Sequence, residues 1–234
     1  RNATEERGVI VVAGPRARDV LRSLTDASLE SAEFPWRSAQ EIDIAGVATL
    51  ALRINYVGEL GWELHPAMAD LQSLYAAIWA AGEAHGIADF GLYALNSLRM
   101  EKAYRGWGAE LTNEVTMPEA DMARFFGSAK EDFVGKTATE AGEAGPLRLV
   151  YFEVDAQDAD VRGGEPIFLN DTCIGVTTSG GYGYTVEKSL GFGYVPSAQS
   201  APGSIIDVGL LDARCRATVL AEPIYDPAND RLAS

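Results

Sequence analysis

The chain has 234 residues, 47% of them hydrophobic, and a formal net charge of −15 at pH 7. Such a length fits one large domain or two modest ones with real cores. The negative charge argues against a broad nucleic-acid or anionic-membrane surface, so we expect neither partner. No run of 18 apolar residues is present, which predicts no membrane-spanning helix. The chain opens on Arg1, close to a strand-like run, and this indicates a fragment of a longer protein.

Cysteine and histidine are too few, and too poorly spaced, to indicate metal or triad chemistry. Cys173 and Cys215 both lie in apolar, strand-like runs, which predicts buried free thiols, with a disulfide as the alternative. The only histidines, His65 and His85, do not have the spacing of metal ligands. We therefore expect no metal site and no Ser-His-Asp triad.

The first third of the chain reads as strands and short helices. Residues 8–13 form an apolar run typical of a buried strand, and the turn at Gly14-Pro15 leads into a short helix. Residues 38–58 alternate on both sides of 45–47, which predicts a β-hairpin. After a Gly58–Gly61 turn the sheet is expected to continue through residues 62–66.

Three helices are predicted next. Residues 68–85 have helical spacing and stop at Gly86. Residues 88–108 are expected to form a second helix that ends near Gly106. Its predicted apolar side consists of Leu92, Leu95, Leu98 and Met100. A short third helix is expected over residues 117–126, with Pro118 at its start.

The composition changes at residues 140–146, a glycine- and proline-containing stretch that predicts a linker. Six short strand-like runs follow, separated by Gly, Pro and Asn-Asp turns, and they indicate a small all-β barrel or sandwich. The expected fold class is α+β: an antiparallel sheet with packed helices, then the small C-terminal all-β domain. The predicted domains are residues 1–140 and 147–234.

The stretch "INYVGELGWELHP", residues 54–66, carries the main candidate site. Gly58 and Gly61 allow a tight turn and a close approach to a ligand. Glu63 stands in an otherwise apolar strand, where a carboxylate must be solvated, paired or open to a partner. A planar edge with two adjacent N–H donors, such as a pterin presents, would satisfy both oxygens, with Tyr56 nearby to stack or hydrogen-bond. The alternative is structural: Glu63 pairs with an arginine, and the aromatic side chains belong to the core.

Six ordered segments together resemble the glycine cleavage T-protein (aminomethyltransferase) family over nearly the whole chain. They are "YVGELGWELH", "FGLYALNSLRMEKAYRGWGAELTNE", "MPEADMARFF", "KEDFVGKTA", "GVTTSGGYGYTVEKSLGFGYV" and "ATVLAEPIYDPANDRL". The forms "LNSLRMEKAYR" and "TSGGYG" are more similar to fused versions of the family. In these, the unit forms the C-terminal half of a dimethylglycine or sarcosine dehydrogenase, behind an FAD-dependent amine oxidase domain. The resemblance implies an N-terminally truncated T-protein folate-binding fold followed by a barrel.

The resemblance also implies a folate site. Glu63 would hold the pterin through its donor edge, Tyr56 would line the same pocket, and Leu64 and His65 would continue its wall. Tyr104 matches an aromatic residue near the folate in some members. Arg124 falls where relatives often carry an aromatic residue beside the pterin.

Three departures from the family pattern matter. Leu95 stands where the T-protein has an arginine that helps to hold folate, which favours the dehydrogenase branch. Asp121 replaces a usual glycine. The family's catalytic aspartate would lie upstream of Arg1, so no catalytic residue is expected here, and this chain alone is expected to be inactive. Arg99, Lys102 and Arg105 recur at helical spacing and are expected to form a solvated face, not a ligand site.

The implied function is one-carbon transfer. The full-length enzyme would oxidatively demethylate a small methylated amine at FAD and pass the one-carbon unit to tetrahydrofolate, giving 5,10-methylenetetrahydrofolate. The alternatives are a stand-alone aminomethyltransferase or demethylase, and a non-catalytic folate-binding module. The expected location is cytoplasmic, or the mitochondrial matrix in a eukaryote.

Overall fold

The computed structural model describes residues 1–127, 129–141 and 145–234. These residues form two compact units, which are described separately: residues 1–95 together with 228–234, and residues 96–227. The predicted linker at 140–146 includes residues 142–144, which lie outside the described residues.

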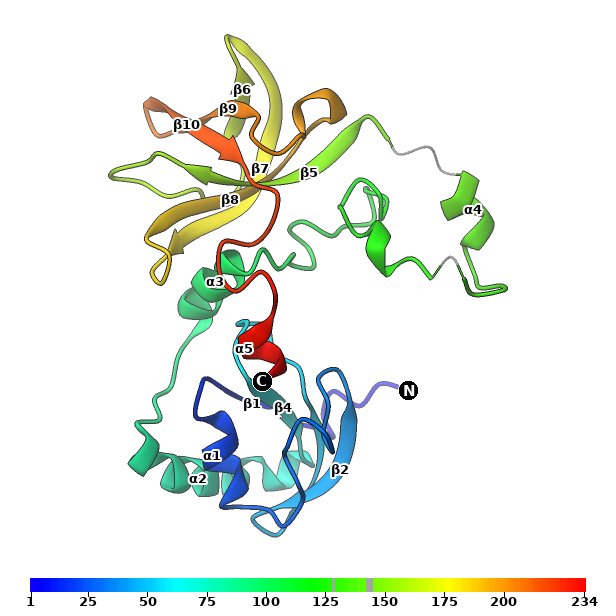
Figure 1. Ribbon diagram of the computed structural model, residues 1–234, viewed down its shortest axis with the longest axis vertical. Coiled ribbons are helices and arrows are strands. Elements are labelled where there is room, and N and C mark those ends of the chain that lie inside the picture. The colour runs from blue at the N-terminus through cyan, green and yellow to red at the C-terminus, as the bar shows by residue number, and fades with distance from the viewer. Residues whose placement is uncertain (128, 142–144) are drawn as a thin grey trace. The chain divides into compact units, whose positions relative to one another are not determined.

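The first unit contains a four-stranded antiparallel sheet in the order β1-β4-β3-β2 (Figure 1). Its strands are β1 (Ile10–Ala13), β2 (Ala39–Ile44), β3 (Val47–Leu52) and β4 (Gly61–His65). Ala45 and Gly46 join β2 to β3 with φ values of 54° and 81°, the left-handed conformations of a tight hairpin turn. The predicted first strand, hairpin and following strand are therefore confirmed.

Two helices cover one face of this sheet, α1 (Ala17–Arg22) and α2 (Leu71–Gly82). Short 3₁₀ turns, η1 (Met68–Asp70) and η2 (Glu83–His85), flank α2, and Gly86 ends the segment with a φ of 72°. The central core side chains come from both helices and from the inner face of the sheet: Val20, Leu21, Ile44, Ala51, Trp62, Leu64, Leu74 and Ile78. The short C-terminal helix α5 (Asp230–Ala233) belongs to the same unit and buries Leu232.

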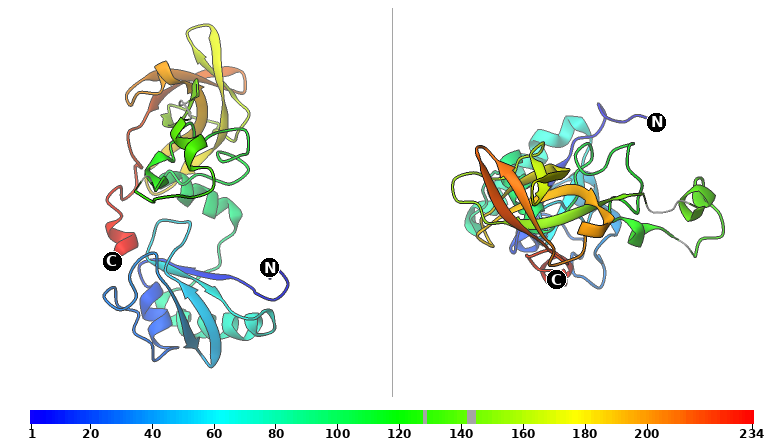
Figure 2. Two further views of the ribbon diagram at one scale, coloured as in Figure 1. Left: turned by 90° about the vertical axis from the view of Figure 1, so that its right-hand side faces the viewer. Right: turned by 90° about the horizontal axis from the view of Figure 1, so that it is seen from above.

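The second unit contains a closed six-stranded barrel in the order β10-β5-β8-β7-β6-β9 (Figures 1 and 2). Its elements are β5 (Leu147–Val154), β6 (Pro166–Leu169), β7 (Thr172–Gly183), β8 (Lys188–Pro196), η4 (Ser197–Gln199), β9 (Ile205–Leu210) and β10 (Ala213–Val219). The structure therefore selects the barrel over the sandwich. Both cysteines are free thiols, but Cys173 is exposed and Cys215 only partly buried, so the prediction that both are buried is wrong.

Two helix predictions also need correction. The predicted helix over 88–108 is shorter, α3 (Leu92–Glu101). Ala103 ends it with a φ of 52°, while the N–H of Tyr104 bonds the carbonyl of Arg99 at 2.9 Å, a Schellman-type end. Leu92, expected on the apolar side, is 82% exposed.

The predicted helix over 117–126 does not form. The segment folds as turns that lead into the 3₁₀ turn η3 (Ala123–Phe125). Asp121 has a φ of 54°, and a left-handed residue cannot continue a right-handed helix. A short helix, α4 (Lys136–Ala141), follows.

Candidate functional site

The outer face of the first sheet, opposite the helices, carries Glu63. Along β4, Trp62 and Leu64 are fully buried against the helices, so Glu63 and His65 point to the other face by the two-residue alternation of a strand. Glu63 lies opposite Val11 of β1 and Leu52 of β3, which share its face. The structure therefore places an acidic group on the outer face of the sheet between two apolar neighbours.

Glu63 is partly accessible and lightly partnered. Its side chain is 27% exposed and that of His65 is 24% exposed, and His65 Nε2 lies 3.3 Å from Glu63 Oε2. Among the described residues no arginine is recorded in contact with this carboxylate. The contact with His65 is long and leaves the second oxygen able to accept from another donor.

The arginines near β4 serve the opposite face. Arg53 is 1% exposed, and its Nη1 donates to the carbonyl of Phe34 at 2.6 Å. Its guanidinium lies 5.7 Å from the centre of the Trp62 ring, and that of Arg18 lies 5.8 Å from the same centre. Both arginines also donate to backbone oxygens of the C-terminal segment, including the carbonyl of Ser234. These cations are therefore committed to backbone oxygens and to an aromatic face.

The loop before Glu63 is shaped by an asparagine that the sequence reasoning missed. Asn55 Oδ1 accepts from the N–H groups of Val57 and Gly58, each at 3.0 Å, and its Nδ2 donates to the carbonyl of Glu59 at 2.6 Å. An asparagine three residues before a glycine is a turn signal that could have identified it. This loop holds Tyr56, which is partly buried.

Gly61 is needed at the start of β4. A Cβ atom there would lie 2.7 Å from the carbonyl oxygen of Val12 and 2.9 Å from Ala13, both on β1. The lack of a side chain at Gly61 thus allows β1 to approach β4 closely. The sequence predicted a close approach of the glycines to a ligand, and the close neighbour of Gly61 in the structure is β1. Gly58, with a φ of 78°, supplies the left-handed turn.

Not all predicted residues share the face of Glu63. His65 does, whereas the side chain of Leu64 is 0% exposed and packs in the core on the opposite face. On the face of Glu63, only the backbone of Leu64 could therefore contact a ligand. Tyr104 and Arg124 belong to the other unit, so their part in the predicted site stays a prediction.

Within the second unit, the segments around Tyr104 and Arg124 are linked. Arg105, next to Tyr104, forms an ion pair with Asp121, three residues before Arg124. The carboxylate of Asp121 thus has a partner, and its φ of 54° is a left-handed conformation that a glycine would adopt without steric strain. Arg124 itself is exposed, and its guanidinium lies 4.8 Å from the ring centre of Phe125.

The side chain of Tyr104 is partly buried. Burial, and secondarily the negative charge of Asp226, raise its pKa above the ordinary value. The hydroxyl therefore stays protonated at neutral pH.

Arg99, in the last turn of α3, and Lys102, just after the helix, do not form a solvated face, and that prediction is wrong. Arg99 and Lys102 are 5% and 2% exposed. Arg99 Nη1 lies 3.2 Å from Glu110 Oε2, and Lys102 Nζ donates to the carbonyl of Asp226 at 2.6 Å. Both cations therefore make their contacts in the interior of the second unit.

Glu110 is the centre of that buried network. It is 0% exposed, and its carboxylate accepts from the N–H of Gly106 at 2.7 Å and from Thr178 Oγ1 at 2.7 Å, as well as from Ser179 Oγ. Asn96 of α3 adds bonds to Arg99 and to the carbonyl of Gly180. The network fixes α3 to the "TSGG" part of β7, so these residues support structure.

Within the described ranges, no helix combines the length and apolar character needed to cross a lipid bilayer. In the same part of the chain, no three His, Cys, Asp or Glu side chains gather where they could hold a metal ion.

The fold first defines a class. It matches the crystal structure of glycine cleavage system aminomethyltransferase T from Bartonella henselae with a TM-score of 0.83 and 24% sequence identity, over 94% of this chain and 60% of that one. The family model of the GCVT N-terminal domain matches residues 1–130, and that of the glycine cleavage T-protein C-terminal barrel domain matches residues 148–226. The chain therefore belongs to the glycine cleavage T-protein family, as its sequence predicted.

Curated relatives fall into two groups. Dimethylglycine dehydrogenase, mitochondrial, from Mus musculus is 42% identical over 99% of this chain, which spans 27% of that protein. Sarcosine dehydrogenase, mitochondrial, from the same species is 35% identical over 87% of this chain and 22% of its own length. Aminomethyltransferase from Listeria innocua is 35% identical over 97% of this chain and 62% of its own length. The chain thus spans about a quarter of the dehydrogenases and under two thirds of the aminomethyltransferase.

Proposed function

We propose that this chain is the tetrahydrofolate-binding part of an FAD-dependent dimethylglycine or sarcosine dehydrogenase-like enzyme. The single observation that carries the proposal is Glu63, a partly exposed carboxylate on the outer sheet face whose one recorded polar contact within the described residues is the long one to His65. The dimethylglycine dehydrogenase from Mus musculus is 42% identical to this chain and the aminomethyltransferase from Listeria innocua 35%, which favours the dehydrogenase branch. Leu95, where the T-protein pattern has an arginine, points the same way.

The acceptor and the apolar side chains on this face fit a folate. The two carboxylate oxygens of Glu63 can accept the paired N–H donors of a pterin edge, with the long contact to His65 giving way at Oε2. Val11 and Leu52 beside it offer apolar surface to a flat ring. Tyr56 and His65 would line the same site, with Tyr104 and Arg124 as further candidates. Bound tetrahydrofolate would supply the amine that takes up the one-carbon unit as 5,10-methylenetetrahydrofolate. The residues of this chain would orient that amine and exclude water, and no side-chain nucleophile is required of them.

The methylated amine and FAD would be handled by the part of the longer polypeptide that this chain does not span, and the family's catalytic aspartate would lie there too. The proposed location is cytoplasmic in a bacterium and the mitochondrial matrix in a eukaryote; the two dehydrogenase relatives are named as mitochondrial proteins. The second candidate, a stand-alone aminomethyltransferase, is favoured by the 62% coverage of the Listeria innocua relative. A complete gene with no dinucleotide-binding fingerprint would select it.

The test uses the full-length protein supplied with dimethylglycine or sarcosine, an electron acceptor and tetrahydrofolate. Amine oxidation and 5,10-methylenetetrahydrofolate are measured separately. The wild type should form both, whereas Glu63→Gln should oxidise the amine but release formaldehyde instead. Glu41→Gln, an exposed carboxylate on β2, is the matched control and should behave as wild type. Equal methylene-folate yields from Glu63→Gln and wild type would contradict the proposal.

A further inference from the structure

The outer face of the first sheet carries an imidazole beside the Glu63 carboxylate. His65 follows Glu63 by two residues on β4, so both side chains point to the same face. His65 Nε2 lies 3.3 Å from Glu63 Oε2, and the two side chains are 24% and 27% exposed. A ligand that approaches Glu63 from this face therefore meets His65 as well.

β3, on one side of this pair, contains no ionisable residue. Its Leu50 lies opposite His65. The loop that leads into β4 contains Tyr56 and Glu59, but it joins the strand at Gly61, the end away from His65. The neighbour of the imidazole on β3 is therefore an aliphatic side chain.

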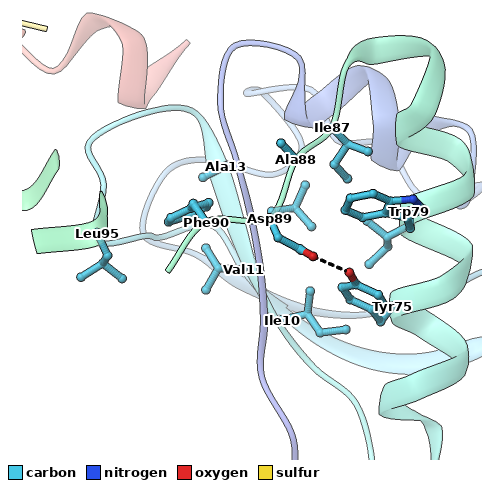
Figure 3. A pocket seen from close by; sticks show the side chains of 12 residues that line it. Ile10, Val11, Ala13, Tyr75, Trp79, Ile87, Ala88, Asp89, Phe90 and Leu95 are labelled. Carbon is cyan, nitrogen blue, oxygen red and sulfur yellow. Dashed lines mark hydrogen bonds between the residues drawn. The ribbon is translucent and has the colours of Figure 1, made fainter. Parts of the chain in front are cut away.

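β1, on the other side of the pair, contains no ionisable residue either. Its Val11 lies opposite Glu63. Figure 3 shows Val11 on the other side of the strand from Ile10, which points toward Tyr75 and Trp79 in an apolar hollow. β1 therefore presents an aliphatic side chain, and no charge, to the face that carries the carboxylate.

Two further segments bring charged groups to this part of the sheet. Arg7, in the segment before β1, is exposed, and its Nη1 donates to the backbone carbonyl of His65 at 2.9 Å. Glu41 and Asp43 belong to β2, which β3 separates from β4, so that β2 and β4 lie about 10 Å apart. Within the described residues, Glu63 is the carboxylate recorded in contact with the imidazole. A charge on His65 therefore acts most directly on Glu63.

We propose that His65 regulates the proposed folate site by competing with the pterin for Glu63 Oε2. This competition rests on the proposed function, because the pterin edge needs both carboxylate oxygens, one for each N–H donor. A protonated imidazole is a cation with a donor at each ring nitrogen, whereas the neutral ring has one donor and one acceptor. Protonated His65 therefore holds Oε2 by a charge-assisted hydrogen bond, and neutral His65 releases it more readily. Folate should bind more tightly as His65 loses its proton.

The competition links folate binding to protonation. Histidine side chains ordinarily change charge between pH 5 and 8. In that range, folate has to displace protonated His65 from Glu63, and this cost is absent once the imidazole is neutral. The affinity for folate therefore rises with pH, and binding releases part of a proton. Ion pairs between partly exposed groups are weak, so we expect a change of about three- to fivefold in Kd.

The test is isothermal titration calorimetry of the full-length protein with 5-formyltetrahydrofolate, from pH 5.5 to pH 8. His65→Gln keeps a neutral donor but cannot gain a proton, and the titration of the ligand itself cancels when the two proteins are compared. The Kd of the wild type should be about three- to fivefold higher than that of His65→Gln at pH 5.5, and equal to it at pH 8. Titrations at pH 6.5 in buffers of different ionisation heat should show a proton release by the wild type that His65→Gln lacks. His85→Gln, at the other histidine of this chain, is the matched control and should behave as the wild type.

Glu63→Gln separates the competition from the proposed function. It removes the carboxylate for which the imidazole and the pterin compete, so its Kd should exceed that of the wild type at pH 8. If the two proteins bind equally at that pH, or if the wild type does not bind the folate, the proposed function fails and the competition fails with it.

A ratio of wild-type to His65→Gln Kd that stays constant from pH 5.5 to pH 8 would overturn the competition alone, with Glu63→Gln still weakened. A constant ratio of one would show that His65 does not affect the ligand. A constant ratio below one would show that His65 only supports the local structure. A ratio that rises with pH would contradict the competition as well.

Discussion

Glu63 and Glu110 are the same side chain in opposite settings. Glu110 is completely buried and accepts from Arg99, Gly106, Thr178 and Ser179. Glu63 is 27% exposed, and among the described residues it is recorded with one polar contact, to His65 at 3.3 Å. A carboxylate whose oxygens are saturated by its own chain can only stabilise the fold, whereas one with an open oxygen on an accessible face can bind a ligand. The following predictions test this difference, from the largest expected effect to the smallest.

Replacing Glu110 by glutamine should cause the largest loss of stability. The buried cation of Arg99 would lose its carboxylate, and breaking one side of a buried pair costs about 3–5 kcal/mol of unfolding free energy. Urea unfolding of the variant measures this, with exposed Glu114→Gln as the control. If the urea midpoint of the variant equals that of the wild type, Glu110 does not stabilise the fold and does not differ from Glu63 in this respect.

Asn96→Ala should cost less, about 1–3 kcal/mol, because it leaves buried partners without their hydrogen bonds. Those partners are the guanidinium of Arg99 and the carbonyl of Gly180. The same urea titration applies, and Asn113→Ala at an exposed position is the control. A loss equal to that of the control would show that the network does not depend on Asn96.

Glu165, in the second unit, should make the stability of the fold depend on pH in the acidic range. Burial raises its pKa, but hydrogen bonds from Thr177 and from the N–H groups of Gly163 and Arg162 outweigh burial and hold the pKa below its ordinary value. A carboxyl with a depressed folded-state pKa stabilises the fold fully above its unfolded-state pKa, about 4.3, and loses that contribution as pH falls through the folded-state value. Thermal midpoints of the wild type between pH 6 and 3 should therefore fall more steeply than those of Glu165→Gln. Parallel curves would show that the hydrogen bonds do not favour the charged form.

Glu63→Gln should have the smallest effect on stability, within about 0.5 kcal/mol, because a partly exposed ion pair contributes little. The urea midpoint of the variant measures it. A loss of several kcal/mol would show that Glu63 is a structural residue like Glu110.

Local patterns in the sequence predicted much of the fold. The hairpin of β2 and β3, the end of the α2 segment at Gly86 and the six barrel strands each depend on neighbours within a few residues. The helix predicted over 117–126 does not form because Asp121 has a left-handed backbone conformation. From the sequence, Asp121 was noted only as a replacement for a usual glycine. Its pairing with Arg105 could not be read from spacing.

The burial of Arg99 and Lys102 shows more clearly what local sequence patterns cannot predict. Arg99 and Lys102 have the spacing of a solvated face. Their burial depends on Glu110, 11 residues from Arg99, and on Asp226, 124 residues from Lys102. In the candidate site, the resemblance put Leu64 and His65 in one wall, whereas the alternation of β4 puts Glu63 and His65 on one face and Leu64 on the other. Asn55 was detectable from its spacing to Gly58 but had no obvious chemistry of its own.

The central claim is that the Glu63 carboxylate is open to a ligand. Titration of reduced folate into the full-length protein, for wild type, Glu63→Gln and Glu41→Gln, tests it most directly. Glutamine would set a donor against a ligand donor, so affinity should fall by roughly 1–3 kcal/mol, about 5- to 150-fold in Kd, while Glu41→Gln stays at the wild-type value. Equal Kd values for all three proteins would contradict the claim.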